Sequence, residues 1–272
     1  MQRRAALLPV FLCLGVFGAA IATTATAQPA PGLPKTVRLA MEGGYPPFSI
    51  VAPDGKITGF DADIAGEICK RLQVTCTQVP MEFDAMIPAL RAKKVDAIVA
   101  SMSITPERQK VVDFSDKYYS SPARMVTKAD AKFEITVPGL KGRRIGVQRN
   151  TIHDRYATAT FKDSEIVRYG KQDEVFLDLV NGRIEATLAD VVAADQGFLK
   201  TPKGAGFALR GPNFDDPAYF GVGAGIALRK GEKALQQAIN GALASLRADG
   251  TYKRINDKYF SFDIYGAEAA KK

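Results

Sequence analysis

The sequence lacks tryptophan altogether and has only one histidine and three cysteines among its 272 residues. Because most zinc sites are built from histidine and cysteine, this shortage argues against a metal site. The sequence also lacks the G-x-S-x-G, H-E-x-x-H and P-loop patterns of common hydrolases, metalloproteases and nucleotide-binding proteins. We therefore expect a protein that is not an enzyme and that needs no cofactor.

Charge of one sign is not concentrated in any segment. Lysine and arginine number 37 against 29 acidic residues, which gives a net charge of +8. The basic residues are scattered, and none of their runs alternates with aromatic residues in the way typical of nucleic-acid-binding surfaces. We therefore expect no nucleic-acid partner. With 46% hydrophobic and 24% charged residues, the composition is that of an ordinary globular protein.

The long apolar run of the sequence lies at its N-terminus. Two arginines precede the apolar stretch Ala5–Ala22, and Ala25–Ala27 forms an A-x-A site. This pattern is typical of a secretory signal peptide, here residues 1–27 with cleavage after Ala27. A membrane anchor is the alternative, but the proline-rich residues 28–34 favour removal, and Cys13 is not preceded by the small residue that lipid attachment requires. We therefore expect an exported protein, either periplasmic or secreted.

Removal of the signal peptide would leave two cysteines, Cys69 and Cys76. In an oxidising compartment, an even count and a close spacing favour a disulfide. It would join the end of a helix to the next strand. Two buried free thiols are the alternative.

After residue 34, β-strand patterns alternate with segments in which apolar residues recur every three or four positions. The strongly apolar run 95–100 is typical of a strand in a parallel sheet that is covered on both faces. The predicted strands are 36–41, 74–79, 95–100, 143–147, 184–189 and 226–228, and the predicted helices are 60–72, 83–93, 152–161, 174–180, 191–198 and 232–247. The sequence therefore predicts an α/β fold with two lobes.

The C-terminal helices can complete the first lobe only if the chain crosses between the lobes twice. These crossings are expected near residues 119–121 and 217–221. Two adjacent crossings make a two-stranded hinge, and lobes joined in this way close around ligands. We expect residues 28–120 and 220–272 to form lobe one and residues 121–219 to form lobe two.

Polar residues follow the predicted strands at their carboxyl ends, where open α/β sheets bind ligands. Glu42, Ser101, Ser103 and Asp190 lie at such ends, and Arg108 follows in the next helical turn. Arg108, with free N–H groups at helix starts, would hold an α-carboxylate. Asp190 with a serine oxygen would hold an α-ammonium, and Glu42 would meet a positive group at the far end. The pattern predicts an amino acid with a cationic side chain.

Two aromatic residues complete this predicted site. Tyr45 and Phe83 are placed to sandwich an aliphatic or guanidinium side chain. Each assignment has a structural alternative, because Asp190 could serve only as a helix cap and both aromatic residues could belong to the core. Asp61 is expected to stabilise the residues of the pocket without contacting the ligand itself.

Six stretches of the sequence resemble the motifs of one family, in that family's order. They are 42–48 (EGGYPPF), 59–63 (GFDAD), 83–88 (FDAMIP), 101–108 (SMSITPER), 113–115 (DFS) and 249–252 (DGTY). They resemble the periplasmic amino-acid-binding proteins of ABC importers, solute-binding protein family 3, and in particular the lysine/arginine/ornithine-binding group. The similarity spans about residues 34–266. It implies a periplasmic-binding-protein-like fold, and a monomer that delivers its ligand to an ABC permease in the inner membrane.

The resemblance also implies roles for individual residues. By position, the ligand-binding residues are Tyr45, Phe83, Ser101, Ser103, Arg108, the backbone N–H of Ile152, His153 and Asp190, with a disulfide between Cys69 and Cys76. The chain departs from the group at Glu42, where Asp is frequent, at Ala100, where a first Ser is usual, and at Ile152-His153, where Thr-Gln is usual. The combination of Glu42 with Gln148-Arg149 resembles arginine- and ornithine-preferring members of the family.

Other ligands and functions stay open at this point. A glutamate at the position of Glu42 also resembles the opine-binding members of the family. An opine or another polar amino acid is therefore an alternative ligand. Periplasmic dehydratases acting on prephenate-like acids resemble this family as well, although a dianionic substrate would be repelled by Glu42 and Asp190 together. The sensing domain of a receptor is disfavoured because the sequence has no second apolar span.

Overall fold

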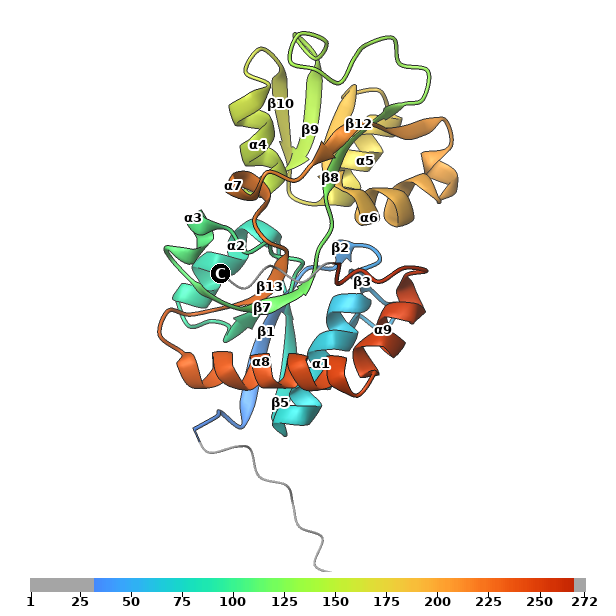
Figure 1. Ribbon diagram of the computed structural model, residues 1–272. Coiled ribbons are helices and arrows are strands. Elements are labelled where there is room, and N and C mark those ends of the chain that lie inside the picture. Colours follow the sequence, from blue (N-terminus) through green and yellow to red (C-terminus); the bar gives the residue numbers. More distant parts are fainter. Residues whose placement is uncertain (1–31, 267–272) are drawn as a thin grey trace, which may run out of the picture.

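Two five-stranded β-sheets, each covered by helices on both faces, build two lobes stacked one above the other (Figure 1). The computed structural model describes residues 32–266, so the predicted signal peptide and its cleavage site lie outside the described residues. None of the helices between residues 32 and 266 combines the length and the apolar character needed to cross a bilayer.

Lobe one, the lower lobe in Figure 1, contains the first strands of the chain and its C-terminal helices. Its main strands are β1 (Thr36–Met41), β5 (Thr75–Pro80), β6 (Ala97–Ile98), β7 (Asp113–Tyr119) and β13 (Ala224–Leu228). Their order in the sheet is β5-β1-β6-β13-β7, with β1 parallel to β5 and β6 and with β13 antiparallel to β6 and β7. A strand from the far end of the sequence therefore lies in the middle of this sheet.

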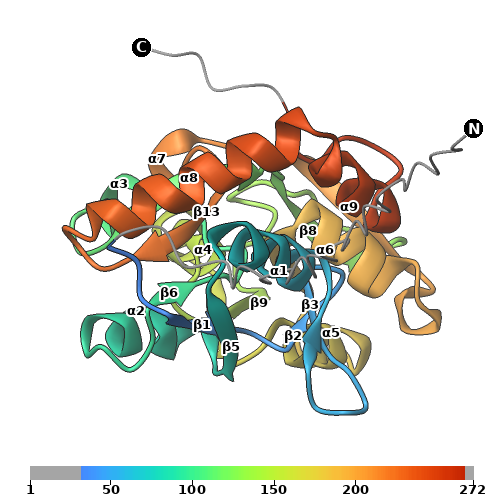
Figure 2. The same cartoon turned by 90° about the horizontal axis from the view of Figure 1, so that it is seen from below.

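A small hairpin sheet and five helices surround the main sheet of lobe one. The hairpin strands are β2 (Gly44–Tyr45), β3 (Ser49–Val51) and β4 (Ile57–Thr58), and the helices are α1 (Phe60–Leu72), α2 (Phe83–Arg91), α3 (Pro106–Gln109), α8 (Lys233–Ala248) and α9 (Thr251–Tyr259). The apolar face of α1, with Phe60 and Ile64, packs on one face of the sheet together with Leu243 of α8. Met86 and Leu90 of α2 pack in a second apolar cluster. Figure 2, a view from below, shows α2 and α8 on opposite sides of the sheet.

Lobe two repeats this architecture with its own sheet. Its strands are β8 (Ala123–Lys128), β9 (Arg144–Gln148), β10 (Glu165–Tyr169), β11 (Ala186–Asp190) and β12 (Phe207–Phe214), and its helices are α4 (Ile152–Thr160), α5 (Gln172–Val180), α6 (Val191–Ala194), a π-helical turn (Asp195–Leu199), a 3₁₀ turn (Pro202–Gly204) and α7 (Pro217–Phe220). The sheet order is β10-β9-β11-β8-β12. Helices α4 and α5 cover opposite faces of it.

The chain passes between the lobes twice, once from β7 to β8 and once from β12 through α7 to β13 (Figure 1). The two-lobe α/β fold predicted from the sequence is thereby confirmed. The predicted lobe boundaries at residues 120/121 and 219/220 stay a prediction. The first falls in the link between β7 and β8, and the second falls inside α7.

Several predicted elements differ in extent from those in the structure. The strand expected over 95–100 is reduced to β6, although Asp96 and Val99 on either side still donate backbone hydrogen bonds to β1, at 2.8 and 3.0 Å. The helix expected to reach residue 93 ends at Arg91, because Lys93 adopts a positive φ of 59°. The helix expected over 191–198 changes from α6 to a π-helical turn at Asp195.

The disulfide predicted between Cys69 and Cys76 is confirmed, and it links the last turn of α1 to β5. Closing a loop this short should stabilise the fold by about 2–3 kcal/mol through the lost entropy of the unfolded chain. We expect replacement of both cysteines by serine to lower the free energy of unfolding in urea by that amount. Ligand affinity should stay within about twofold, because neither cysteine lines the cavity described below. A large loss of affinity would contradict this separation.

Candidate ligand-binding site

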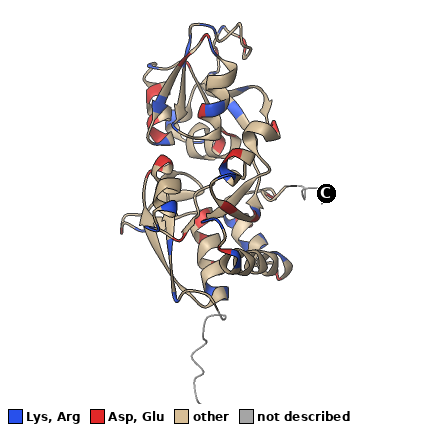
Figure 3. Ribbon diagram, turned by 90° about the vertical axis from the view of Figure 1, so that its left-hand side faces the viewer, with Lys and Arg blue, Asp and Glu red and all other residues tan. Residues whose placement is uncertain are grey.

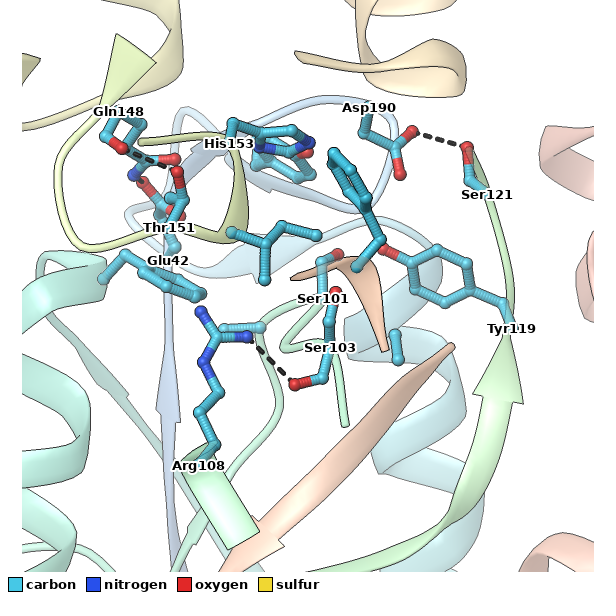
Figure 4. Close-up of a pocket in the computed structure, with 16 residues that line it drawn as sticks. Glu42, Ser101, Ser103, Arg108, Tyr119, Ser121, Gln148, Thr151, His153 and Asp190 are labelled. Atoms are coloured by element: carbon cyan, nitrogen blue, oxygen red, sulfur yellow. Dashed lines mark hydrogen bonds between the residues drawn. The ribbon is translucent and has the colours of Figure 1, made fainter. Parts of the chain in front are cut away.

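A cavity lies between the two lobes and receives side chains from both of them (Figure 4). The interior space that water-sized spheres can occupy measures about 40 Å³, so the lining side chains lie close together around a narrow cavity. All nine residues predicted to bind the ligand line it, namely Glu42, Tyr45, Phe83, Ser101, Ser103, Arg108, Ile152, His153 and Asp190. The structure therefore brings together residues that are up to 148 positions apart in the sequence.

The ends of the strands explain why these residues meet. Glu42 directly follows β1, Ser101 and Ser103 follow β6, and Asp190 is the last residue of β11. In both sheets these carboxyl ends therefore lie at the cavity between the lobes. This is the edge at which open α/β sheets bind ligands.

Arg108 lies in the short helix α3, whose first turn is fixed by a side-chain cap. The Thr105 hydroxyl accepts a hydrogen bond from the backbone N–H of Arg108 at 3.3 Å. The guanidinium Nη1 donates to the backbone oxygen of Ser103 at 3.0 Å, and its carbon lies 5.3 Å from the centre of the Phe83 ring. Among the residues that the structure describes, no carboxylate forms an ion pair with it. Burial lowers the pKa of Arg108 to about 10, so the side chain is still a cation at neutral pH.

Asp190 caps α6 and faces the cavity from lobe two. Its Oδ1 accepts hydrogen bonds from the N–H groups of Val192 and Ala193, at 2.8 and 3.1 Å, and from the Ser121 hydroxyl at 2.9 Å. All three bonds converge on one oxygen, and Figure 4 shows the other oxygen turned toward the interior of the cavity. Burial raises the pKa of Asp190 to about 6, despite the three donors that oppose this shift.

Glu42 connects the two lobes inside the cavity. The amide Nε2 of Gln148 donates to Glu42 Oε1 at 2.7 Å and to the backbone oxygen of Gly170 at 3.1 Å. Only 3% of Glu42 is exposed, and this burial raises the pKa of its carboxyl group to about 7. A cation that entered the cavity here would favour the ionised form of Glu42.

Aromatic rings form part of the cavity wall. Tyr45 is stacked on Phe48 at 5.7 Å between ring centres, and Phe48 is stacked in turn on Tyr119 at 4.7 Å. His153 lies in the first turn of α4, with its ring 6.2 Å from that of Phe220. Burial, with the charge of Arg108, lowers the pKa of His153 to about 3, so this histidine is neutral at physiological pH.

The sequence reasoning missed several residues that line the cavity. Tyr119, Ser121 and Phe220 lie on or beside the two crossings, and Gln148 ends β9. The position of Gln148 at the end of a predicted strand was a usable signal, and so was the predicted crossing at 119–121. The predicted crossing at 217–221 likewise contained Phe220, although nothing in the local sequence shows that α7 places its ring beside His153.

Contacts at the rim of the cavity hold the lobes against each other. Arg155 of α4 forms an ion pair with Glu107 of α3, and Arg149 Nε lies 3.7 Å from Asp84 Oδ2 of α2. Both pairs are partly exposed, so each is expected to contribute less than about 1 kcal/mol. Figure 3 shows acidic and basic residues scattered along the ribbon of both lobes. Between residues 32 and 266 no cluster of three potential metal ligands occurs.

Comparisons with known proteins agree with this architecture. An L-arginine-binding protein of Pseudomonas aeruginosa is 48% identical over 250 residues, which cover 91% of this chain and 96% of the relative. The lysine/arginine/ornithine-binding periplasmic protein of Escherichia coli is 45% identical and covers 86% of this chain and 91% of its own length. A solved Salmonella typhimurium periplasmic binding protein described as highly specific for arginine aligns with a TM-score of 0.77 and 36% identity, over 84% of this chain and all of that one.

One structural relative bears on the alternative of an enzyme. An ancestral amino-acid-binding protein, described as a precursor of cyclohexadienyl dehydratase, aligns with a TM-score of 0.73 and 30% identity over 84% of this chain and 96% of that one. The family of bacterial extracellular solute-binding proteins, family 3, matches residues 37–262. This match covers most of the chain, including every residue of the cavity. The chain therefore belongs to the bacterial extracellular solute-binding proteins of family 3.

Proposed function

We propose that the protein binds a basic amino acid, arginine, ornithine or lysine, in the cavity between its lobes and delivers it to an ABC transporter permease. The observation that carries this proposal is the set of buried charges in the cavity. Arg108 is a cation that forms no ion pair within residues 32–266, and Glu42 and Asp190 are buried carboxyl groups on different elements. A basic amino acid has the complementary set, with one carboxylate and two cationic groups.

Each group of the ligand has a partner in this arrangement. The α-carboxylate would bind the guanidinium of Arg108 and the free N–H groups at the start of α4, including that of Ile152. The α-ammonium would bind Asp190 and the serine oxygens. The aliphatic part of the side chain would lie between Tyr45 and Phe83. Charge-assisted hydrogen bonds of about 1.5–3 kcal/mol each are sufficient for micromolar affinity, about −8 kcal/mol.

The cationic end of the ligand would meet Glu42 and Gln148. Both amide hydrogens of Gln148 are already donated, to Glu42 and to Gly170, so its oxygen is left as an acceptor. A guanidinium has five N–H donors in a planar fork, and it can use both the carboxylate and this amide oxygen. The names of the relatives, which include arginine-binding and lysine/arginine/ornithine-binding proteins, support this ligand class. An opine or another polar amino acid is the second candidate.

The same proposal includes the cellular role. We infer that residues 1–27 are removed after Ala27 and that the mature chain works as a monomer in the periplasm. Residues 28–120 with 220–272 would form one lobe and residues 121–219 the other, and closure of the lobes on the ligand would present it to the permease. The periplasmic relatives support this role. We propose no catalytic activity, and a turnover assay with prephenate that gave appreciable product would contradict this.

Titration calorimetry tests the proposed function directly. Mature protein that has been unfolded, freed of bound ligand and refolded is titrated with arginine, ornithine, lysine, histidine, an opine and glutamine. We expect micromolar or tighter binding of at least one basic amino acid and much weaker binding of glutamine. If none of the basic amino acids releases or absorbs heat, and none raises the unfolding temperature, the proposed function is wrong.

Binding should depend on pH because the cavity carboxyl groups have raised pKa values. In the ligand-free protein the pKa is about 7 for Glu42 and about 6 for Asp190, and burial raises that of neighbouring Asp61 to about 7 as well. A cationic ligand favours the ionised forms, so at lower pH its binding must displace protons. We expect arginine affinity to fall at least tenfold between pH 8 and pH 5, measured by calorimetry in two buffers of different ionisation enthalpy.

The same shifts affect the stability of the ligand-free protein. A carboxyl group whose pKa is raised by folding stabilises the protein fully below its ordinary pKa, near 4, and this contribution is lost as the pH rises through 6 to 7. Arginine should therefore raise the unfolding temperature more at pH 8 than at pH 5. Equal affinities and equal temperature shifts at the two pH values would contradict the assignment of these groups to the binding site.

A further inference from the structure

Asp61 is a fully buried acid directly behind the cavity wall. It lies in the first turn of α1, and its backbone N–H donates to the Phe48 oxygen at 2.9 Å. Its side chain is 0% exposed, and its hydrogen-bond partners are two hydroxyl groups. The Tyr118 hydroxyl donates to Oδ1 at 2.8 Å, and the Ser101 hydroxyl donates to Oδ2 at 3.0 Å. A buried carboxylate is costly unless hydrogen bonds satisfy it, and here two hydroxyl groups do so.

Ser101 is held by this acid in an unusual backbone conformation. Its φ of +52° is in the left-handed region, which costs a residue other than glycine about 1–2 kcal/mol. Two side chains hold it there, because its backbone N–H donates to the Tyr118 hydroxyl oxygen at 3.2 Å while its own hydroxyl donates to Asp61. Ser101 lines the cavity, and Figure 4 shows it between Arg108 and Asp190.

The number of available hydrogens fixes how the Ser101 hydroxyl can act. A serine hydroxyl has a single hydrogen, and with Asp61 ionised, the form that a cationic ligand favours, that hydrogen is donated to the carboxylate. The hydroxyl hydrogen of Tyr118 is also donated to Asp61, so neither hydroxyl has a hydrogen left for the cavity. The Ser101 oxygen can then meet a ligand only as an acceptor. An ammonium group can only donate, and it is the matching partner.

We propose that Asp61 is a positioning residue that makes the Ser101 hydroxyl an obligate acceptor and thereby gives this end of the cavity its preference for the α-ammonium of the ligand. This inference rests on the proposed function, and it adds the selectivity for α-amino acids over analogues that lack the amino group. Asp61 does not touch the ligand. It acts through Ser101, while Asp190 supplies the direct negative partner on the other side.

The variant Asp61→Asn tests this proposal because it keeps the size of the side chain and changes the hydrogen bonding. An amide offers one acceptor oxygen and one donor nitrogen, so either Ser101 or Tyr118 must turn its hydrogen away. Arginine is compared with 5-guanidinopentanoate, which is arginine without the α-amino group. The affinity of the weaker ligand is measured by displacement titration. We expect the variant to bind arginine at least tenfold more weakly and 5-guanidinopentanoate within about threefold of the unaltered protein.

Asp63 of the same helix provides a matched control. Its carboxylate accepts hydrogen bonds from Lys258 and Tyr259 of α9, both at 2.7 Å, and it does not line the cavity. The Asp63→Asn variant should bind both ligands as the unaltered protein does. If Asp61→Asn weakens the two ligands equally, Asp61 has only a structural role and the proposal is overturned.

Ser101→Ala keeps the proposal testable if Asp61→Asn does not fold. Removal of the hydroxyl should weaken arginine binding about tenfold, and the proposal fails if this variant binds arginine normally. If both variants fold, the double variant should be no more than twofold worse than Ser101→Ala, because Asp61 acts through that hydroxyl. Fully additive losses would overturn the proposal. Failure of the unaltered protein to bind any basic amino acid would instead count against the proposed function.

Discussion

Replacement of Arg108 by alanine should weaken arginine binding by two to three orders of magnitude, the largest effect that we expect from one substitution. Arg108 is the only arginine or lysine among the residues that line the described cavity. Its loss would leave the α-carboxylate of the ligand buried without a cationic partner, and breaking a buried ion pair in this way costs about 3–5 kcal/mol. The backbone N–H groups at the start of α4 would still donate hydrogen bonds to the carboxylate. For this reason we set the smallest expected loss of affinity at two orders of magnitude.

Agmatine, which is arginine without the carboxylate, provides the control for this prediction. Because it has no group for Arg108 to bind, Arg108→Ala should leave its affinity unchanged or increase it. Arg108→Lys keeps the charge but loses the two-pronged hydrogen bond, and we expect it to fall between the other two proteins. Calorimetry with both ligands measures these differences. If Arg108→Ala binds arginine with an affinity within fivefold of that of the unaltered protein, the α-carboxylate of the ligand does not bind to Arg108.

The meeting of these residues in one cavity could be predicted because several of them follow strands that have strong sequence patterns. Glu42 comes after a six-residue strand, and Asp190 ends a strand whose residues are all buried. The sequence pattern of a strand shows where the strand ends, and therefore which residues lie at the edge of the sheet. The topology of the sheet then brings these residues together. Thr105 and Thr151 are of a residue type that favours helix N-caps, and in the structure each precedes its helix and accepts a hydrogen bond from a backbone N–H of the first turn.

Two of the elements that were missed, β12 and α9, have weak local patterns. Strand β12 (FALRGPNF) contains Gly and Pro and lies at the edge of its sheet with no fully buried residue, so it has no buried face to give an alternating signal. Helix α9 is largely polar and packs through few side chains, including Tyr252. The positive φ of Ser101 could not be predicted either, because it depends on Asp61 and Tyr118, which are 40 and 17 positions away.

Replacement of Glu42 by glutamine separates charge from shape at the other end of the ligand. Glutamine has nearly the same size as glutamate, and its amide oxygen can still accept the hydrogen bond from Gln148 that joins the lobes. The substitution therefore removes the negative charge while the cavity keeps its shape and its contact between the lobes. We expect arginine, ornithine and lysine to bind at least about a hundredfold more weakly, since a buried cation would lose its charged partner.

A neutral ligand should respond differently to the same substitution. Glutamine has no cationic group for Glu42 to meet, so its affinity in Glu42→Gln should be unchanged or higher, because an unpaired buried carboxylate has been removed.

Glu82→Gln is a matched control for this pair of measurements. Glu82 is an exposed acid close enough to raise the pKa of Glu42, but it does not line the cavity. It should change neither affinity by more than about twofold, which would show that charge near the cavity is not sufficient. If Glu42→Gln weakens arginine and glutamine equally, Glu42 supports the closed arrangement of the lobes and does not bind the side chain. Glu42→Gln should also weaken the pH dependence of arginine binding near pH 7, because Glu42 would no longer take up a proton there while Asp61 still would.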